Sequence, residues 1–176
     1  MRARLALLCM IAFAAGAAAE VCSPPLRFRW DTRSTFLWSD RPERFPQLAQ
    51  ARWRVVSEHR ARPHPWEVGW LVIGDERRFV AFVPKSNGWH LEIFDADPPG
   101  RTSQQTFLAS GESPQFPVGE WTEATMIAWE GGVFVVCADL FLDWRWMQDR
   151  PAPTWWGEPV RAGFYLEDCC LERNAP

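Results

Sequence analysis

The sequence has little histidine, lysine and tyrosine, and these shortages limit the classes of function. Among 176 residues there are one lysine, one tyrosine and three histidines, His59, His64 and His90, and no CxxC pair occurs. A zinc site needs three or four convergent histidine, cysteine or carboxylate ligands, and a thioredoxin-like redox site needs CxxC. We therefore expect no metal and no other cofactor. With a net charge of −3, a nucleic-acid partner is not expected either.

Helical patterns are also scarce, and the chain contains 15 prolines. Proline interrupts helices because it lacks the backbone N–H, and only Pro46–Arg54 has a pattern that allows a short helix. Elsewhere, short apolar or alternating runs end at glycine, proline or asparagine, which is typical of strands. The expected strands include Leu26–Trp30, Arg52–Glu58, Glu67–Ile73, Phe79–Val83, Trp89–Asp95, Thr106–Ala109, Trp121–Trp129, Val133–Leu140 and Ala162–Glu167. We predict an all-β fold, an antiparallel β-sandwich of about ten strands with Val133–Cys137 in a central strand.

The first 19 residues have the pattern of a cleaved signal peptide. Arg2 and Arg4 precede an apolar stretch, and Ala17–Ala19 supply small residues before a cleavage point at Glu20. The apolar stretch is too short to span a bilayer, and no later segment replaces it. We expect a single domain over residues 20–176, periplasmic or secreted, without a transmembrane segment.

Four cysteines remain after that cleavage, namely Cys22, Cys137, Cys169 and Cys170. An even number of cysteines in an oxidising compartment indicates disulfides. Adjacent residues of a strand point to opposite faces, so Cys169 and Cys170 are expected to pair with Cys22 and Cys137. A bond between the two adjacent cysteines is the alternative.

Charge is distributed unevenly along the chain. Residues 27–62 contain nine basic and four acidic residues, whereas residues 89–176 contain five basic and fourteen acidic residues. A basic face could meet an anionic partner. The explanation we favour is that basic and acidic strands pair across one sheet.

Twelve tryptophans are the most distinctive part of the composition. Each buries a large apolar ring and carries one N–H that needs a partner. Those in strand patterns are assigned to the core, and Trp38 and Trp66 remain unassigned. The core set is Trp30, Trp53, Trp70, Trp89, Trp121 and Trp129.

Four further tryptophans lie within residues 143–157, in a polar-flanked stretch rich in proline and glycine. Sugars stack their C–H faces on such rings, and exposed aromatic side chains with a polar rim mark binding sites. The alternative is that these rings close the open end of the sandwich. The candidate ligand-binding residues are Trp144, Trp146, Asp149, Arg150, Trp155 and Trp156.

The acidic run at residues 91–97 does not have the arrangement of a catalytic carboxylate pair. In a regular strand Glu92 points to the face opposite to that of Asp95 and Asp97. Asp95, Asp97 and Gly100 could contribute to a calcium loop, but we favour a solvated acidic turn.

Over residues 88–174 the chain resembles the concanavalin A-like jelly-roll superfamily, which includes laminin-G-like and 3-keto-disaccharide hydrolase-like domains. The resemblance implies a jelly roll and a glycan-related role. The segments that carry it are Trp89–Asp95, Pro117–Trp121, Gly131–Val135, Gly163–Asp168 and Glu172–Asn174.

Three functions are compatible with these observations. The interpretation we favour is a carbohydrate-binding module that recognises a polysaccharide or other glycan through the tryptophan-rich loop. The second is a glycoside hydrolase with two carboxylates in one groove, for which Asp143 with Asp149, or Glu92 with Glu130, are the candidates. The third is an envelope protein that contacts another protein through the face of residues 27–62.

Overall fold

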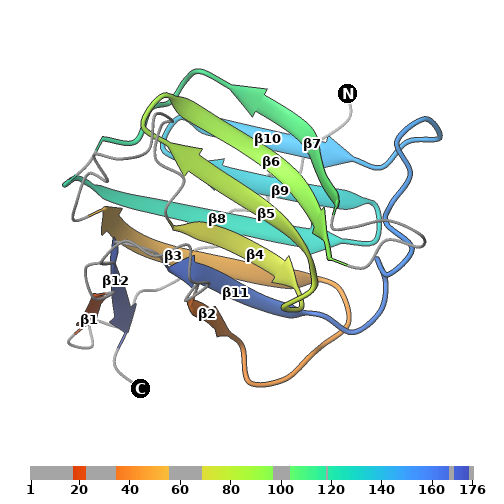
Figure 1. Cartoon of the computed structure of the whole chain (residues 1–176), viewed down its shortest axis with the longest axis horizontal. Helices are drawn as coiled ribbons and strands as arrows, with labels where there is room; N and C mark the ends of the chain where they lie inside the picture. The colour runs from red at the N-terminus through yellow and green to blue at the C-terminus, as the bar shows by residue number, and fades with distance from the viewer. Residues whose placement is uncertain are drawn as a thin grey trace, which may run out of the picture.

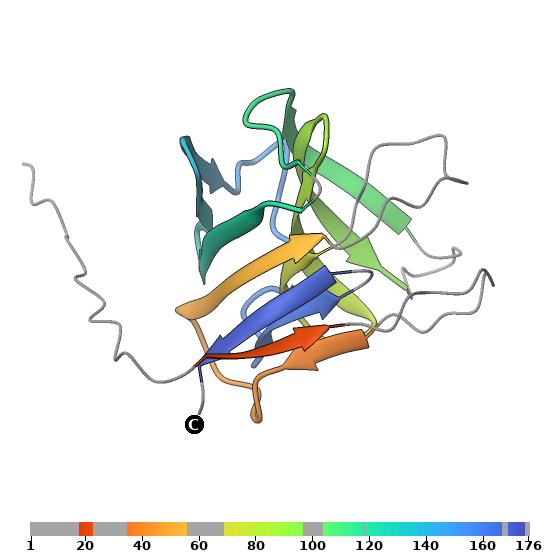
Figure 2. The ribbon, with the colours of Figure 1, turned by 90° about the vertical axis from the view of Figure 1, so that its left-hand side faces the viewer.

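The computed structural model is an antiparallel β-sandwich of two six-stranded sheets (Figure 1). The two sheets face each other as separate layers when the molecule is turned (Figure 2). No helix long and apolar enough to cross a membrane is found in the part of the chain that the structure describes. The structure describes residues 18–22, 35–55, 69–96, 104–117, 119–166 and 169–174.

Every neighbouring pair of strands in the two sheets is antiparallel. Sheet A contains, in spatial order, β1 (Ala18–Cys22), β12 (Cys169–Asn174), β3 (Gln47–Val55), β8 (Trp121–Trp129), β9 (Gly132–Cys137) and β10 (Leu140–Arg145). Sheet B contains β2 (Thr35–Trp38), β11 (Arg161–Leu166), β4 (Trp70–Gly74), β5 (Arg78–Lys85), β6 (Gly88–Asp95) and β7 (Gln104–Gly111). Four consecutive strands, β4 to β7, thus lie in one sheet, and the next three, β8 to β10, lie in the other. The predicted all-β sandwich is confirmed, whereas its jelly-roll topology stays a prediction.

The main core lies between the inner faces of the two sheets. On β3, Ala49, Ala51 and Trp53 are buried. The residues between them are more exposed, and this period of two is that of a strand. Trp53 packs against Phe164 of β11, with ring centroids 5.1 Å apart. The short helix allowed at Pro46–Arg54 is therefore wrong, since Gln47–Val55 is a strand.

Two hairpins form where the sequence predicts them. Between β4 and β5, the Asp75 carboxylate accepts the N–H groups of Arg77 and Arg78 at 2.8 and 2.9 Å. A Cβ at Gly74 would lie 2.1 Å from the Arg78 carbonyl oxygen, so the close approach requires glycine. Between β8 and β9, Trp129 pairs with Gly132 across a two-residue turn.

The prediction for the next segment is wrong in one respect. The expected strand Val133–Leu140 is broken by a turn at Ala138 and Asp139, after which β10 runs back along β9. Ala138 has φ 51°, a conformation that alanine seldom adopts, so composition gave no signal for this turn. β10 forms the edge of sheet A, and β9 is next to the edge rather than central. The expected strand Leu26–Trp30 lies outside the described residues.

The cysteine prediction also needs correction. Cys137 is a buried free thiol at the end of β9, and burial raises its pKa to about 12. β3 and β8 separate β9 from β12. Three strand spacings give roughly 14 Å, beyond the Cα separation of about 7 Å that a disulfide tolerates. Cys22 and Cys170, in contrast, are directly paired in register.

Opposite charges pair across sheet A. Arg52 on β3 lies opposite Glu123 of β8 on one side and opposite Glu172 of β12 on the other. This register agrees with the cross-strand explanation of the uneven charge. Much of the remaining basic segment lies outside the described residues.

The core assignment of the tryptophans is confirmed for Trp53 and Trp89, which are buried between the sheets. It is wrong for Trp121, which is half-buried, with the guanidinium carbons of Arg52 and Arg54 5.0 and 5.1 Å from its ring. Trp70 packs in a second apolar cluster on the outer face of sheet B. Trp30 and Trp66 lie outside the described residues.

Candidate functional site

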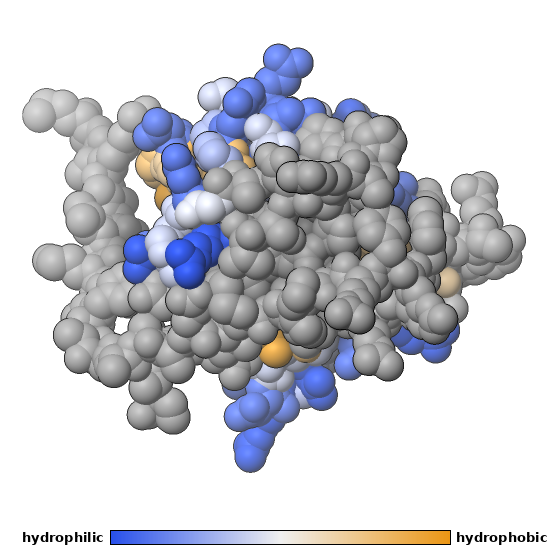
Figure 3. All heavy atoms as spheres, turned by 60° about the vertical axis from the view of Figure 1, so that its left-hand side comes forward, coloured by the Kyte–Doolittle hydropathy of each residue, from blue (hydrophilic) through white to orange (hydrophobic). Residues whose placement is uncertain are grey.

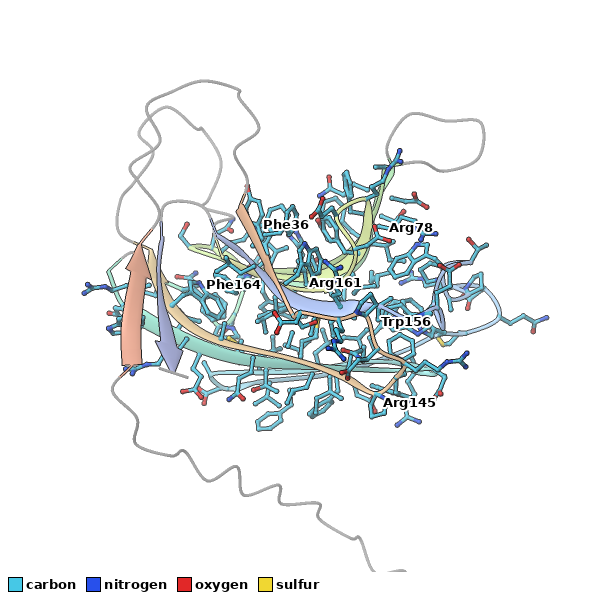
Figure 4. All side chains as sticks on the ribbon, turned by 90° about the horizontal axis from the view of Figure 1, so that it is seen from below. Phe36, Arg78, Arg145, Trp156, Arg161 and Phe164 are labelled. Atoms are coloured by element: carbon cyan, nitrogen blue, oxygen red, sulfur yellow. The ribbon has the colours of Figure 1, made fainter. Side chains whose placement is uncertain are left out.

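The predicted tryptophan site closes one end of the sandwich. β10 ends at Arg145, and the following loop, residues 146–160, passes around this end of the molecule to reach β11 (Figure 1). We call Trp144, Trp146, Trp155 and Trp156 the tryptophan cap. All four rings pack on the main core, and Figure 4 shows Trp156 at the same end as Arg78 and Arg145. The four rings thus pack in the way that the alternative prediction describes, as a closure of the open end of the sandwich.

The rings of the cap form a continuous series of edge-to-face contacts. Trp144 and Trp146 have centroids 6.5 Å apart, Trp146 and Trp156 5.1 Å, and Trp155 and Trp156 5.7 Å. Phe45 extends the series, with its centroid 4.6 Å from that of Trp156. Trp155 is only 2% exposed. Its ring is therefore part of the core and not the exposed stacking platform that the sequence suggested.

The indole N–H groups of the cap fall into two kinds. Trp156 donates to the carbonyl oxygen of Trp129 at 3.0 Å. The N–H groups of Trp144, Trp146 and Trp155 are buried and have no acceptor. A buried donor without a partner costs about 1–3 kcal/mol, so three in one cluster are unusual for a purely structural closure.

Two guanidinium groups lie over the cap. The Arg150 guanidinium carbon is 5.5 Å from the Trp144 ring centroid, and Arg150 Nη1 donates to the Leu108 carbonyl oxygen at 3.3 Å. The Arg78 guanidinium carbon is 6.0 Å from the ring centroid of Trp155.

These two cations differ in their ion pairing. Arg78 contacts Asp75 at 3.2 Å and Glu158 at 3.3 Å. Burial lowers the pKa of Arg78, but hydrogen bonds and charge from these two carboxylates outweigh burial and raise it. No described carboxylate forms an ion pair with Arg150. Asp149, the neighbouring candidate, is exposed in the turn between Met147 and Arg150.

A second group of polar side chains lies on the outer face of sheet B, and sequence reasoning missed it as a group. His90 and Glu92 of β6 are 2% and 1% exposed, and His90 Nε2 lies 2.8 Å from Glu92 Oε2. The angle of this contact does not fit a hydrogen bond, and His90 Nδ1 also has no hydrogen-bond partner. Gln105 of β7 donates from Nε2 to Glu92 Oε2 at 2.6 Å.

Phe107 of β7 completes this group, which we call the β6–β7 site: His90, Glu92, Gln105 and Phe107. The Phe107 ring meets the His90 ring edge to face, with centroids 4.9 Å apart. Phe107 is 60% exposed, and Gln105 is also exposed. The buried pair is thus bordered by an exposed ring and an exposed amide. The signal was present in the sequence, because positions 90 and 92 share one face of a strand.

Aromatic rings continue across the same face of sheet B. Phe79 and Phe94 stack at 5.0 Å, and Phe36 stacks on Trp38 at 5.3 Å. Figure 4 shows Phe36 and Arg161 on the side of sheet B turned away from sheet A, whereas Phe164 lies between the sheets. In the view of Figure 3, described hydrophobic side chains reach the surface in small patches among hydrophilic ones. The exposed large apolar residues are Leu48, Phe107, Ile127, Phe141 and Met147.

The predicted carboxylate pairs are placed as follows. Asp143 forms an exposed ion pair with Arg145 at 2.9 Å, and Asp149 lies in the turn beyond β10. Glu92 belongs to sheet B, whereas Glu130 is exposed in the β8–β9 turn of sheet A. No group of three or more histidine, cysteine or acidic side chains able to hold a metal occurs among the described residues. Of the residues suggested for a calcium loop, Asp95 ends β6, whereas Asp97 and Gly100 lie outside the described residues.

No protein-family model matches the chain, and no curated protein matches it at a significant level. Among solved structures, the chain is similar to an alginate lyase from Pseudomonas aeruginosa, with 12% identical residues and a TM-score of 0.40. The alignment covers 75% of this chain and 63% of the lyase chain, so this chain spans less than two thirds of the lyase. Similarity at this level gives no basis for transferring an activity, and the fold assignment rests on the two sheets themselves.

Proposed function

We propose that the protein is a glycan-binding β-sandwich domain of the periplasm or the cell exterior, and that the β6–β7 site is a contact point for the glycan. The observation that carries the proposal is the placement of a buried His90–Glu92 pair on an outer sheet face, beside an exposed phenylalanine. A buried polar pair contributes little to stability compared with apolar residues. The presence of this pair beside the second apolar cluster, where apolar residues would fit, is therefore best explained by what it holds in place.

The residues of the β6–β7 site have separate roles in this proposal. Phe107 offers an exposed ring on which a sugar can stack its C–H groups. Gln105 offers an amide to sugar hydroxyls, and its hydrogen bond to Glu92 fixes the orientation of that amide. His90 and Glu92 are positioning residues, since both are almost fully buried. A fixed amide loses less conformational entropy on binding than a free one.

The tryptophan cap offers fewer ligand contacts than its sequence suggests. Trp155 is too buried to stack directly on a sugar. Trp144, Trp146 and Trp156 are half-buried, and Asp149 and Arg150 are exposed, so these five remain proposed ligand contacts. We do not propose hydrolysis, because Asp143 is already ion-paired with Arg145 and because Glu92 belongs to sheet B whereas Glu130 lies in a turn of sheet A.

The experiment is a binding measurement with a matched control residue. Phe107 and Phe141 are both exposed phenylalanines on edge strands, 60% and 72% exposed, but they lie on different sheets. Binding of the full chain to a panel of soluble polysaccharides is measured by affinity electrophoresis, and the best ligand is then titrated calorimetrically. We expect Phe107→Ala to weaken binding about tenfold, which corresponds to roughly 1.4 kcal/mol. Phe141→Ala should leave binding unchanged.

Equal effects of the two substitutions would contradict the assignment of the β6–β7 site. Absence of binding to every polysaccharide of the panel would contradict the function. Because both side chains are largely exposed, neither substitution is expected to unfold the domain.

A further inference from the structure

The tryptophan cap contains three buried N–H donors that the fold leaves without acceptors. They belong to Trp144, Trp146 and Trp155. The fourth indole, that of Trp156, donates to the Trp129 carbonyl oxygen in the same environment. The chain thus supplies an acceptor to one indole of the cap and none to the other three.

The indole groups of the cap and the guanidinium groups over it are hydrogen-bond donors. An indole offers one N–H and no acceptor, and a guanidinium offers only donors. A neutral sugar hydroxyl both donates and accepts, so it matches such a site poorly. A carboxylate or a sulfate carries only acceptors at neutral pH and matches it well.

Arg150 provides the charge that such a group needs. It is exposed, it lies over the Trp144 ring, and no described carboxylate pairs with it. Arg78 and Arg145 are already paired, with Asp75 and Glu158 and with Asp143. Of these three arginines, Arg150 is therefore the one whose charge no described carboxylate already pairs.

We propose that the tryptophan cap binds an anionic group of an acidic glycan, with Arg150 pairing to the carboxylate or sulfate and the indole N–H of Trp144 donating to it. The Trp144 N–H is covered in the unliganded arrangement. Arg150 is the exposed side chain above the ring, and an anion that pairs with it draws it away from the indole. The inference rests on the proposed function, because it names the class of glycan.

The test compares two acidic ligands with a neutral one. The full chain is titrated calorimetrically with a galacturonate tetramer, with its fully methyl-esterified form and with a sulfated tetrasaccharide. We expect a charged ligand to bind at least tenfold more tightly than the ester. Preference for the galacturonate identifies a carboxylate as the group bound, and preference for the sulfated sugar identifies a sulfate.

Three variants show whether the cap is responsible. Trp144→Phe removes the N–H and keeps an aromatic ring, and Arg150→Gln removes the charge. Both should reduce affinity for the acidic ligand about tenfold without lowering the melting temperature. Trp89→Phe is the matched control, because Trp89 lies outside both proposed sites and its N–H already has an acceptor in the Ser113 carbonyl oxygen at 2.8 Å. This control should lower the melting temperature and leave affinity unchanged.

Two results would overturn the inference. The first is a Trp144→Phe protein that melts earlier but binds as the parent does, since its N–H would then serve the fold through the neighbouring ring. The second is equal affinity for the galacturonate and its ester, with binding that depends on Phe107 alone. In that second case the glycan-binding function stands and only the ligand class is wrong. If neither charged nor neutral glycans bind, both proposals fail.

Discussion

The pair formed by His90 and Glu92 can be tested by replacing both residues with apolar ones. In register, His90 lies opposite Val83 and Glu92 lies opposite Ala81, and both neighbours are fully buried. Leucine at position 90 and valine at position 92 would therefore meet apolar neighbours. Gln105 loses its partner on Glu92, but it is exposed and can bond to water instead.

The expected magnitudes differ sharply between the single and the double variants. Removing one member of a buried polar pair leaves the other without its partner and costs about 1–3 kcal/mol. We expect Glu92→Val alone to fall in this range, since both side chains are at most 2% exposed. Replacing both members by packed apolar residues ranges from neutral to about 1–4 kcal/mol stabilising. The double variant, His90→Leu with Glu92→Val, should thus be at least as stable as the parent.

Guanidinium unfolding followed by tryptophan fluorescence measures these differences, and an unchanged m-value confirms that the same surface is exposed on unfolding. The same double variant should bind the best glycan ligand about tenfold more weakly, because Gln105 is no longer held. The reasoning is refuted if the double variant is as unstable as Glu92→Val. The pair would then support the fold and not the amide of Gln105.

Two further predictions concern the fold. Gly69 and Gly119 have φ of 90° and 88°, but a Cβ at Gly69 would lie 2.5 Å from Trp53 Nε1, whereas a Cβ at Gly119 meets nothing within 4 Å. Alanine at either position should lower the free energy of unfolding by about 1–2 kcal/mol, because of the left-handed backbone conformation. Gly69→Ala should lower it by about 1–3 kcal/mol more, because its Cβ overpacks the core. Equal denaturation midpoints for Gly69→Ala and Gly119→Ala would contradict this expectation. For Cys137, the folded pKa of about 12 lies above the unfolded value, so its stabilising contribution is complete below about pH 8.5 and is lost as pH rises towards 12. Urea unfolding should show that the free energy of unfolding falls more between pH 8 and pH 10 in the parent than in Cys137→Ala. In a separate test, non-reducing peptide mapping should find Cys137 unlinked and Cys22 joined to Cys170.

Local pattern predicted the parts of the fold whose geometry is set by neighbouring residues. The β4–β5 turn follows from Gly74 and Asp75, because a glycine and a side-chain acceptor suffice to build it. The turn at Ala138 did not follow, since its φ of 51° is imposed by the pairing of β9 with β10. β12 was missed because its pairing with β1 and β3 joins distant parts of the chain.

The candidate sites also combine features that the local sequence predicts with features that depend on distant parts of the chain. That Glu92 and Asp95 point to opposite faces follows from strand periodicity. That Gln105 reaches Glu92 depends on the pairing of β6 with β7, which no local pattern specifies. The burial of Trp155 also depends on distant contacts, because residues 143–157 have the polar composition of a surface loop.

The distribution of unpartnered indole donors is a final argument for a site at the tryptophan cap. The fold gives acceptors to buried indoles elsewhere, as Trp89 shows by donating to the Ser113 carbonyl oxygen at 2.8 Å. Among the described residues, three buried indole donors without a hydrogen-bond partner lie together in the tryptophan cap, whereas Trp38 Nε1 on β2 lies apart, at the edge of sheet B opposite to β7. A sequence selected for stability alone would not gather three such donors in one cap. Their concentration is what a protein shows when those groups are kept for a ligand.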